Sequence, residues 1–211
     1  IIRPASFCGV MGFKPTDGLI PRTGVLNASP PLDTIGTYAR SLEDIALITE
    51  VLMAYDAGDK ASRIQASPAL SECLTTESPM TPIIGFAKTS VWDQADETTQ
   101  EAFEELADML GDDCREVPLS EPFDHLAAMH KNIMAADLAK NYAPYHERGK
   151  DQLSDILCNM IEFGQTVSAI DYNTAIDGQA LLNRGLDMVF EHYDIIITPA
   201  APGEAPHGLD S

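Results

Sequence analysis

The chain opens with Ile1-Ile2-Arg3-Pro4-Ala5-Ser6-Phe7-Cys8-Gly9-Val10-Met11-Gly12-Phe13-Lys14-Pro15-Thr16. This stretch begins a segment, residues 1–39, in which glycine and proline separate short apolar pieces. Proline fixes φ and lacks a backbone N–H, so the segment predicts turns and short strands and argues against a helix. We expect the apolar residues between Gly9 and Gly36 to pack in the interior; they are Val10, Phe13, Ile20, Val25, Leu26 and Ile35.

The next segment has the pattern of an amphipathic helix. Ser41 is a favourable N-cap residue, and Glu43 and Asp44 place negative charge at the positive end of the helix dipole. The helix is expected to end near residues 56–58. Apolar residues recur at three- and four-residue spacing and predict one apolar face, made of Leu42, Ile45, Ile48, Leu52 and Tyr55.

Strands and helices alternate through the remainder. The apolar runs at residues 82–87 and 193–199 each predict a buried strand. Helices are expected over residues 96–110, 122–141 and most of 151–192, with a polar loop over 144–150 and breaks near Gly164 and Asp171. The acidic residues of 96–110, Glu104 among them, are expected on a solvated face. The alternation predicts an α/β fold with a mixed or largely parallel sheet, and the few strands visible suggest that further sequence completes it.

The opening residues resemble the amidase signature family. In that family a serine-rich segment ending Gly-Gly-Ser precedes a Phe-Cys-Gly-Val stretch and a Gly-Phe/Leu-Lys-Pro-Thr motif. This chain carries both motifs at the family spacing, and departs from the usual residues at Asp17 and at Thr37-Tyr38. The matching blocks are Phe7-Cys8-Gly9-Val10, Gly12-Phe13-Lys14-Pro15-Thr16, Leu32-Asp33-Thr34-Ile35-Gly36, residues 39–47 and the late strand at 194–199.

The resemblance implies a mixed β-sheet flanked by helices, with residues 1–211 forming a central-to-C-terminal portion of one amidase signature domain truncated at both ends. It also implies hydrolysis of a carboxamide to a carboxylic acid and ammonia or an amine. Family members use a serine nucleophile, a second serine in a cis peptide and a lysine base. The motif alignment puts the nucleophile immediately before Ile1, so we expect no catalytic residue within 1–211 and no amidase activity from this chain alone.

Arg3 is the one candidate substrate-binding residue. In relatives with the same spacing from the nucleophile, an arginine here lines the substrate pocket, where its guanidinium can fork onto a carboxylate or carbonyl. The alternative is a structural arginine bonded to loop carbonyls. The resemblance gives Lys14 a structural or surface role and Ser6 a turn or buried hydroxyl. Cys8 has an apolar setting with no histidine or other base near it in sequence, which predicts a packed thiol and not a nucleophile.

Three functions stay open at this point. The first is a stand-alone amidase, favoured because Arg3 leads straight to Pro4. The second is the glutaminase A subunit of a tRNA-dependent Asp/Glu amidotransferase, which usually has glutamine after this arginine. The third is a catalytically dead domain that acts as a binding or scaffold module.

Composition limits the partners. With 13 basic and 33 acidic residues the net charge is −20, which disfavours binding to nucleic acid and to anionic membranes. The resemblance implies a small-molecule amide as the ligand. No apolar run approaches the ~18 residues of a membrane span. The spacing of the cysteines and histidines predicts no metal site, and no cofactor is expected. We expect reduced thiols in a cytoplasmic protein, an exposed His146, and leave open a homodimer of the full-length enzyme.

Overall fold

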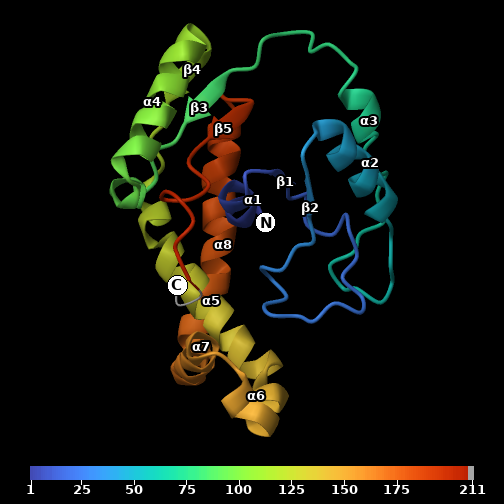
Figure 1. Cartoon of the computed structure of the whole chain (residues 1–211), viewed down its shortest axis with the longest axis vertical. Helices are drawn as coiled ribbons and strands as arrows, with labels where there is room; N and C mark the ends of the chain where they lie inside the picture. The colour runs from blue at the N-terminus through green and yellow to red at the C-terminus, as the bar shows by residue number, and fades with distance from the viewer. Residues whose placement is uncertain (209–211) are drawn as a thin grey trace. The chain divides into compact units, whose positions relative to one another are not determined.

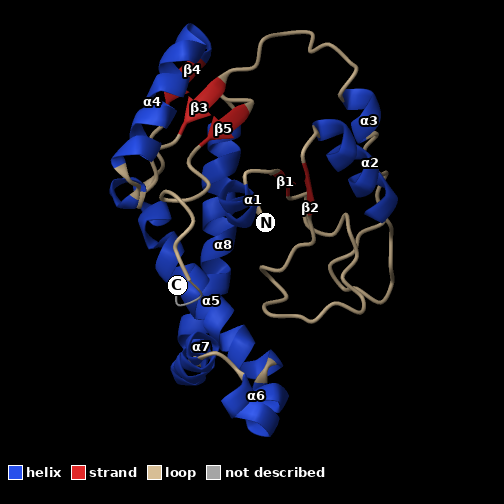
Figure 2. Cartoon of the chain, viewed as in Figure 1, coloured by secondary structure: helices blue, strands red, loops and turns tan. Residues whose placement is uncertain are grey.

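A computed structural model describes residues 1–208. Its contacts divide the chain into two compact units. Unit 1 comprises Ile1–Leu26, Thr34–Thr81 and Pro199–His207, and unit 2 comprises Asn27–Asp33 and Pro82–Thr198 together with Gly208. Both units are built mostly from helices and loops, with short strands (Figures 1 and 2).

Unit 1 contains the opening motifs. Its elements are α1 (Ile2–Cys8), β1 (Met11–Phe13), β2 (Thr37–Ala39), α2 (Leu42–Leu52) and α3 (Leu70–Cys73). β1 and β2 pair antiparallel, with Met11 opposite Ala39 and Phe13 opposite Thr37.

Helix α1 overturns the expectation that the prolines exclude a helix from residues 1–39. Pro4 is the third residue of α1, within the first turn, where a backbone N–H has no acceptor inside the helix. The helix ends at Gly9, whose φ of 62° is left-handed and whose N–H donates to the carbonyls of Ala5 and Ser6. Proline position, and not proline content, therefore decides whether a helix forms here.

Helix α2 confirms the predicted N-cap but not the predicted face. The Ser41 Oγ accepts from the Asp44 N–H at 3.1 Å. The helix ends at Leu52, a few residues earlier than predicted, and it buries Ile45, Ala46 and Thr49. Four of the five residues of the predicted face are instead exposed by 38–54%, namely Leu42, Ile48, Leu52 and Tyr55.

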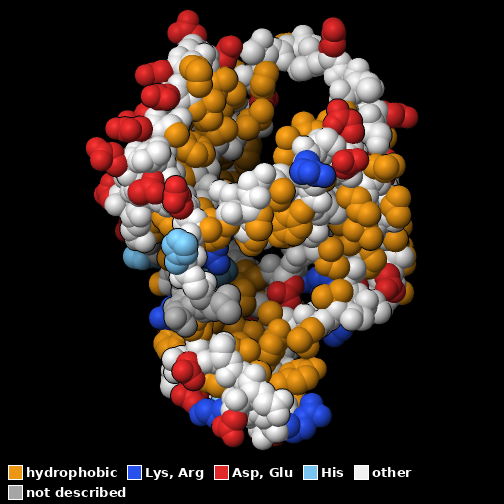
Figure 3. All heavy atoms as spheres, viewed as in Figure 1, with side chains coloured by type: hydrophobic (Ala, Val, Ile, Leu, Met, Phe, Trp, Pro, Cys, Tyr) orange, Lys and Arg blue, Asp and Glu red, His pale blue; other side chains and the backbone are white. Residues whose placement is uncertain are grey.

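The contact between α2 and β2 explains why the predicted apolar face is exposed. The Thr49 Oγ1 lies 2.8 Å from the Thr37 Oγ1 of β2, and both side chains are buried, so a hydroxyl pair joins the helix to the strand. The exposed apolar residues of α2 are Leu42, Leu47, Ile48, Val51 and Leu52. Figure 3 shows apolar side chains gathered on this side of unit 1.

The apolar residues between Gly9 and Gly36 are mostly covered. Ile20 is buried, while Val10, Phe13 and Ile35 are half-buried. Val25 and Leu26 are exposed by 50% and 54%, so the prediction of interior packing is wrong for this pair.

An ion pair holds together two loops of unit 1. The Asp59 carboxylate accepts from the Arg22 backbone N–H at 2.8 Å, from its Nε at 3.2 Å and from its Nη2 at 3.3 Å. Both side chains are less than 10% exposed. The Arg22 guanidinium, followed by the Ala61 N–H, lowers the pKa of Asp59 to about 2.

This depressed pKa predicts an acid-dependent loss of stability. An aspartate with a folded pKa below its unfolded value stabilises the fold above the unfolded pKa of ~3.9, and the contribution is lost as the pH falls towards the folded pKa. We expect Asp59→Asn to lower the free energy of unfolding by about 1–2 kcal/mol at neutral pH and to flatten its decline between pH 5 and pH 3. Denaturant titrations of the complete protein at several pH values measure this. Asp17→Asn, at an exposed carboxylate of the same unit, is the control, and equal pH curves for the two variants would contradict the prediction.

Unit 2 contains a parallel three-stranded sheet. Its strands are β3 (Ile84–Phe86), β4 (Cys114–Glu116) and β5 (Ile195–Ile197), in the order β4-β3-β5. Ile84 lies opposite both Cys114 and Ile195. Both predicted strands are present, and the α/β class is confirmed with them. The predicted burial holds for β3 but is wrong for β5, where Ile195 is 42% exposed and Ile196 and Ile197 are half-buried.

Helices make up most of unit 2. They are α4 (Glu97–Leu110), α5 (Leu126–Asn141), α6 (Ala143–Gly149), α7 (Asp155–Thr166) and α8 (Ala169–Phe190), with 3₁₀ turns η1 (Trp92–Gln94), η2 (Gly111–Asp113), η3 (Glu121–His125) and η4 (Lys150–Gln152). The α5–α7 contact forms a core in which Ile133 and Ile161 are fully buried.

Two predicted boundaries in unit 2 are wrong. The expected polar loop at 144–150 is helix α6, because Pro144 lies in the first turn, where it is tolerated. The break in 151–192 falls at Val167–Ser168 and not at Gly164 or Asp171. Gly164 lies inside α7, and the Asp171 N–H donates to the Oγ of Ser168, the N-cap of α8, at 3.1 Å.

Candidate functional site

Arg3 lies on the exposed side of α1 in unit 1. The buried residue of this helix is Ala5, and the helix turns Arg3 away from that contact. Among residues 1–208, the guanidinium has no hydrogen-bond or ion-pair partner. The loop-carbonyl bonds of the structural alternative are therefore absent from the described part of the chain, and the five N–H donors of Arg3 are free to meet a ligand.

The other polar residues of the opening motifs form no catalytic group with each other. The Lys14 Nζ donates to the adjacent Pro15 carbonyl at 2.8 Å, and its side chain is exposed. Ser6 and Cys8 are exposed as well. The expectations of a packed Cys8 thiol and of a turn or buried Ser6 are wrong, because α1 points both side chains to solvent.

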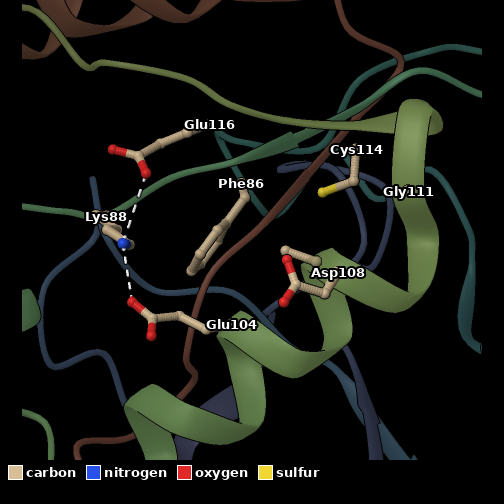
Figure 4. Close-up of a pocket in the computed structure, with 8 residues that line it drawn as sticks. Phe86, Lys88, Glu104, Asp108, Gly111, Cys114 and Glu116 are labelled. Carbon is tan, nitrogen blue, oxygen red and sulfur yellow. Dashed lines mark hydrogen bonds and ion pairs between the residues drawn. The ribbon is translucent and has the colours of Figure 1, made fainter.

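Unit 2 contains a cavity of about 450 Å³ that sequence reasoning did not identify. It lies on the face of the sheet that α4 covers, between that helix and strands β3 and β4 (Figure 4). Its walls are Phe86, Lys88, Glu104, Ala107, Asp108, Gly111, Cys114 and Glu116. Phe86 stacks on Phe103 of α4 with ring centroids 6.3 Å apart, which anchors the helix to the central strand.

Lys88 occupies the acidic end of this cavity. Its Nζ lies 3.0 Å from Glu104 and 3.5 Å from Glu116, and 5.6 and 5.4 Å from the ring centroids of Phe86 and Trp92. The hydrogen bond to Glu104, more than any other contact, raises the pKa of Lys88. The ammonium thus joins α4 to β4 and is satisfied within the chain (Figure 4).

The cavity lacks the parts of a nucleophilic centre. Burial raises the pKa of the Cys114 thiol, so this sulfur stays protonated near neutrality. The Lys88 ammonium, with its raised pKa, is no base either. The Lys88 contacts fix α4 on the sheet.

Glu104 lies on a solvated face as predicted, whereas His146 differs from its predicted setting. Glu104 is 53% exposed, as a solvated acid should be, yet it also pairs with Lys88. The sequence did contain a signal for this cavity. Lys88 follows a buried strand by two residues, and Glu104 and Asp108 are four residues apart on the next helix, so they share one of its faces. His146 is half-buried in α6 and not exposed in a loop, and its Nε2 has no hydrogen-bond partner among residues 1–208.

Residues 1–208 contain neither a candidate metal site nor a membrane-spanning helix. In this range no three His, Cys, Asp or Glu side chains gather closely enough to hold a metal ion. None of the helices in the same range combines the length and apolar character needed to cross a bilayer.

Comparison with known proteins identifies the family. The family model described as Amidase matches residues 1–210. The chain belongs to the amidase family, as its opening motifs predicted.

Curated relatives agree with this assignment. The A subunit of the glutamyl-tRNA(Gln) amidotransferase of Clostridium botulinum is 30% identical over 96% of this chain and 47% of its own length. The corresponding protein of Methanosphaera stadtmanae is 27% identical over 99% of this chain and 48% of its own length. The chain therefore spans about half the length of the curated relatives it matches.

Solved structures show the same fold at lower identity. A structure described as a vestigial protein complex that reveals the origins of an s-triazine catabolic enzyme superposes with a TM-score of 0.87, at 24% identity, over 98% of this chain and 44% of that one. The A subunit of the Thermotoga maritima glutamyl-tRNA(Gln) amidotransferase superposes with a TM-score of 0.75, at 23% identity, over 95% and 44%. The predicted fold class is confirmed.

Proposed function

We propose that the complete protein hydrolyses a small carboxamide to a carboxylic acid and ammonia or an amine. The observation that carries this proposal is the match of the amidase family to residues 1–210, opening motifs included. The resemblance supplies the chemistry, with a serine nucleophile expected immediately before Ile1, a second serine as proton relay and a lysine base. The test is ammonia or amine release by the complete protein, which should disappear when that serine is replaced by alanine.

Arg3 has the substrate-binding role in this proposal. It is exposed, it has no partner among the described residues, and it would lie three positions after the nucleophile. A planar guanidinium can hold a carboxylate or carbonyl through two parallel hydrogen bonds. Arg3 would therefore select amides that carry a second polar or acidic group.

Replacing Arg3 tests this role in the complete enzyme. Arg3→Ala should lower kcat/KM about ten- to a hundredfold for an amide with an acidic group, and much less for a plain aliphatic amide, because a charge-assisted hydrogen bond contributes roughly 1.5–3 kcal/mol. Arg3→Lys keeps the charge but loses the fork, so its loss should be intermediate. Specificity constants on both amides measure the difference. Equal losses on both, with a lower melting temperature, would remove Arg3 from the site.

A second candidate is the glutaminase component of a tRNA-dependent amidotransferase. It is supported by the curated relatives described above, which are A subunits of that enzyme. Pro4, where such proteins usually have glutamine, favours the stand-alone amidase. Glutamine hydrolysis that requires partner proteins and charged tRNA would establish the second candidate. No hydrolysis in either assay would favour a catalytically inactive binding or scaffold domain.

The remaining expectations belong to the same proposal. A cytoplasmic setting is supported by four cysteines that are all free thiols. The net charge of −20 supports a small-molecule ligand over nucleic acid or an anionic membrane. Whether the complete protein is a homodimer is decided by analytical ultracentrifugation.

A further inference from the structure

A second cavity in unit 2, of about 350 Å³, lies between α5 and α7, which pack against each other (Figure 1). Asn159, Met160 and Phe163 lie three, four and seven positions after Ile156, so the four residues share one face of α7. Lys131 and Ala135, one turn apart on α5, complete the lining. The cavity is thus an apolar groove with one cation and one amide at its edge.

Its apolar surface is open to solvent. Ile156 is 42% exposed and Phe163 is 38% exposed, although the adjoining Ile161 is fully buried. A hydrocarbon ligand between these side chains would remove apolar area from water, which is favourable. The groove therefore favours an apolar ligand body.

The charge of the groove is the reverse of the charge of the chain. The chain has 33 acidic residues, yet Lys131 is the only charged residue in the lining. Its neighbours three and four positions away on α5 are uncharged; they are Ala127, Ala128, Met134 and Ala135. Within residues 1–208 its ammonium has no carboxylate partner, and its one described contact is the Phe163 ring, 4.5 Å from the Nζ to the centroid.

Lys88 and Lys131 differ in their carboxylate partners. In the cavity beside α4, the lysine lies over aromatic rings and is also paired with two glutamates. In the groove between α5 and α7, the lysine lies over an aromatic ring without any carboxylate. A ligand that brings a carboxylate would complete the same arrangement.

We propose that this groove binds a small amphipathic carboxylate, with its alkyl or aryl body against Ile156, Met160 and Phe163 and its carboxylate on the Lys131 ammonium. The exposed Asn159 amide can donate to the second carboxylate oxygen. The proposal goes beyond amide hydrolysis, because it uses neither Arg3 nor any expected catalytic group. It assigns a separate ligand site to unit 2.

Three probes of equal chain length test the proposal on the complete protein by isothermal titration calorimetry. Octanoate should bind saturably, whereas octylamine and octanol should bind at least tenfold more weakly, since they lack the anion. Lys131→Met, which keeps the apolar stem, should weaken octanoate at least tenfold. Lys140→Met, at an exposed lysine on the same helix, should leave octanoate binding unchanged.

The contrary results are equally clear. Absence of saturable octanoate binding at millimolar concentration would overturn the proposal, and so would equal binding of octylamine or an unaltered affinity in Lys131→Met. Because Lys131 is exposed, its replacement should not prevent folding, and an unchanged melting temperature checks this. Ile156→Asp, which puts a carboxylate at the mouth of the groove, should abolish octanoate binding, and retained binding would also count against the site.

Discussion

Gly164→Ala is expected to destabilise the complete protein by about 3 kcal/mol, although alanine is the better helix former. Gly164 is buried in α7, where a Cβ would lie 1.9 Å from the Ala135 carbonyl oxygen and 2.9 Å from the Ala139 Cβ. Both obstacles are on α5, and the nearer one is backbone, which cannot rotate away. The added methyl must therefore push α5 and α7 apart and loosen the core around Ile133 and Ile161.

A second glycine provides a matched control. At Gly178 of α8 a Cβ would also meet an atom at 1.9 Å, but that atom is the terminal methyl of Met129, which can swing aside. Gly178→Ala should therefore change stability by no more than about 1 kcal/mol, since the gain in helix propensity offsets the adjustment. Denaturant unfolding of the two variants compares them directly. If both variants lost the same free energy of unfolding, the contact of Gly164 with α5 would be no tighter than that of Gly178 with Met129.

The elements that sequence patterns predicted are those whose signals are local. Ser41 and Asp96 each accept a hydrogen bond from a backbone N–H three residues on, so the starts of α2 and α4 could be read from the cap residues alone. The apolar runs around Ile84 and Ile196 needed only hydrophobicity to be recognised as strands, although only the first of the two strands is buried. Helix α1 was missed because its proline argued against a helix, although Pro4 lies in the first turn, where it is tolerated. Helix α6 was missed because its polar residues suggested a loop.

Features that depend on contacts between distant parts of the chain could not be predicted from local sequence patterns. The buried face of α2 is chosen by the Thr37–Thr49 hydroxyl pair, and no periodicity of apolar residues encodes that contact. The same holds for the two lysines of unit 2. Their partners depend on packing: α4 and β4 bring Glu104 and Glu116 to Lys88, whereas no described residue brings a carboxylate to Lys131. Arg3, by contrast, was singled out through a motif, and the structure adds that its guanidinium is free in the described chain.

Asp137→Ala is expected to cost about 3 kcal/mol, because it breaks a buried polar network that joins three parts of unit 2. Asp137 of α5 is 6% exposed and accepts from the Ser29 Oγ at 2.7 Å and from the Tyr172 Oη of α8 at 3.2 Å. Ser29 is fully buried, and its loop is closed by Asp33, whose carboxylate accepts from the Ala28 and Ser29 N–H groups. Burial first, then the nearby Asp137 charge, raises the pKa of Tyr172, so its phenol remains a donor.

Graded replacements separate this network from simple packing. Asp137→Asn keeps the shape and an acceptor oxygen, and its amide can donate to the Ser29 hydroxyl, so its loss should be nearer 1 kcal/mol. Tyr172→Phe removes only the longer bond and should cost about 0.5–1.5 kcal/mol. In Asp137→Ala the Ser29 hydroxyl is left buried without an acceptor, so combining that change with Ser29→Ala should cost less than the sum of the two single losses. Additive losses in this double-mutant cycle, measured by denaturant unfolding, would show that the 2.7 Å bond between the two side chains contributes little to the fold.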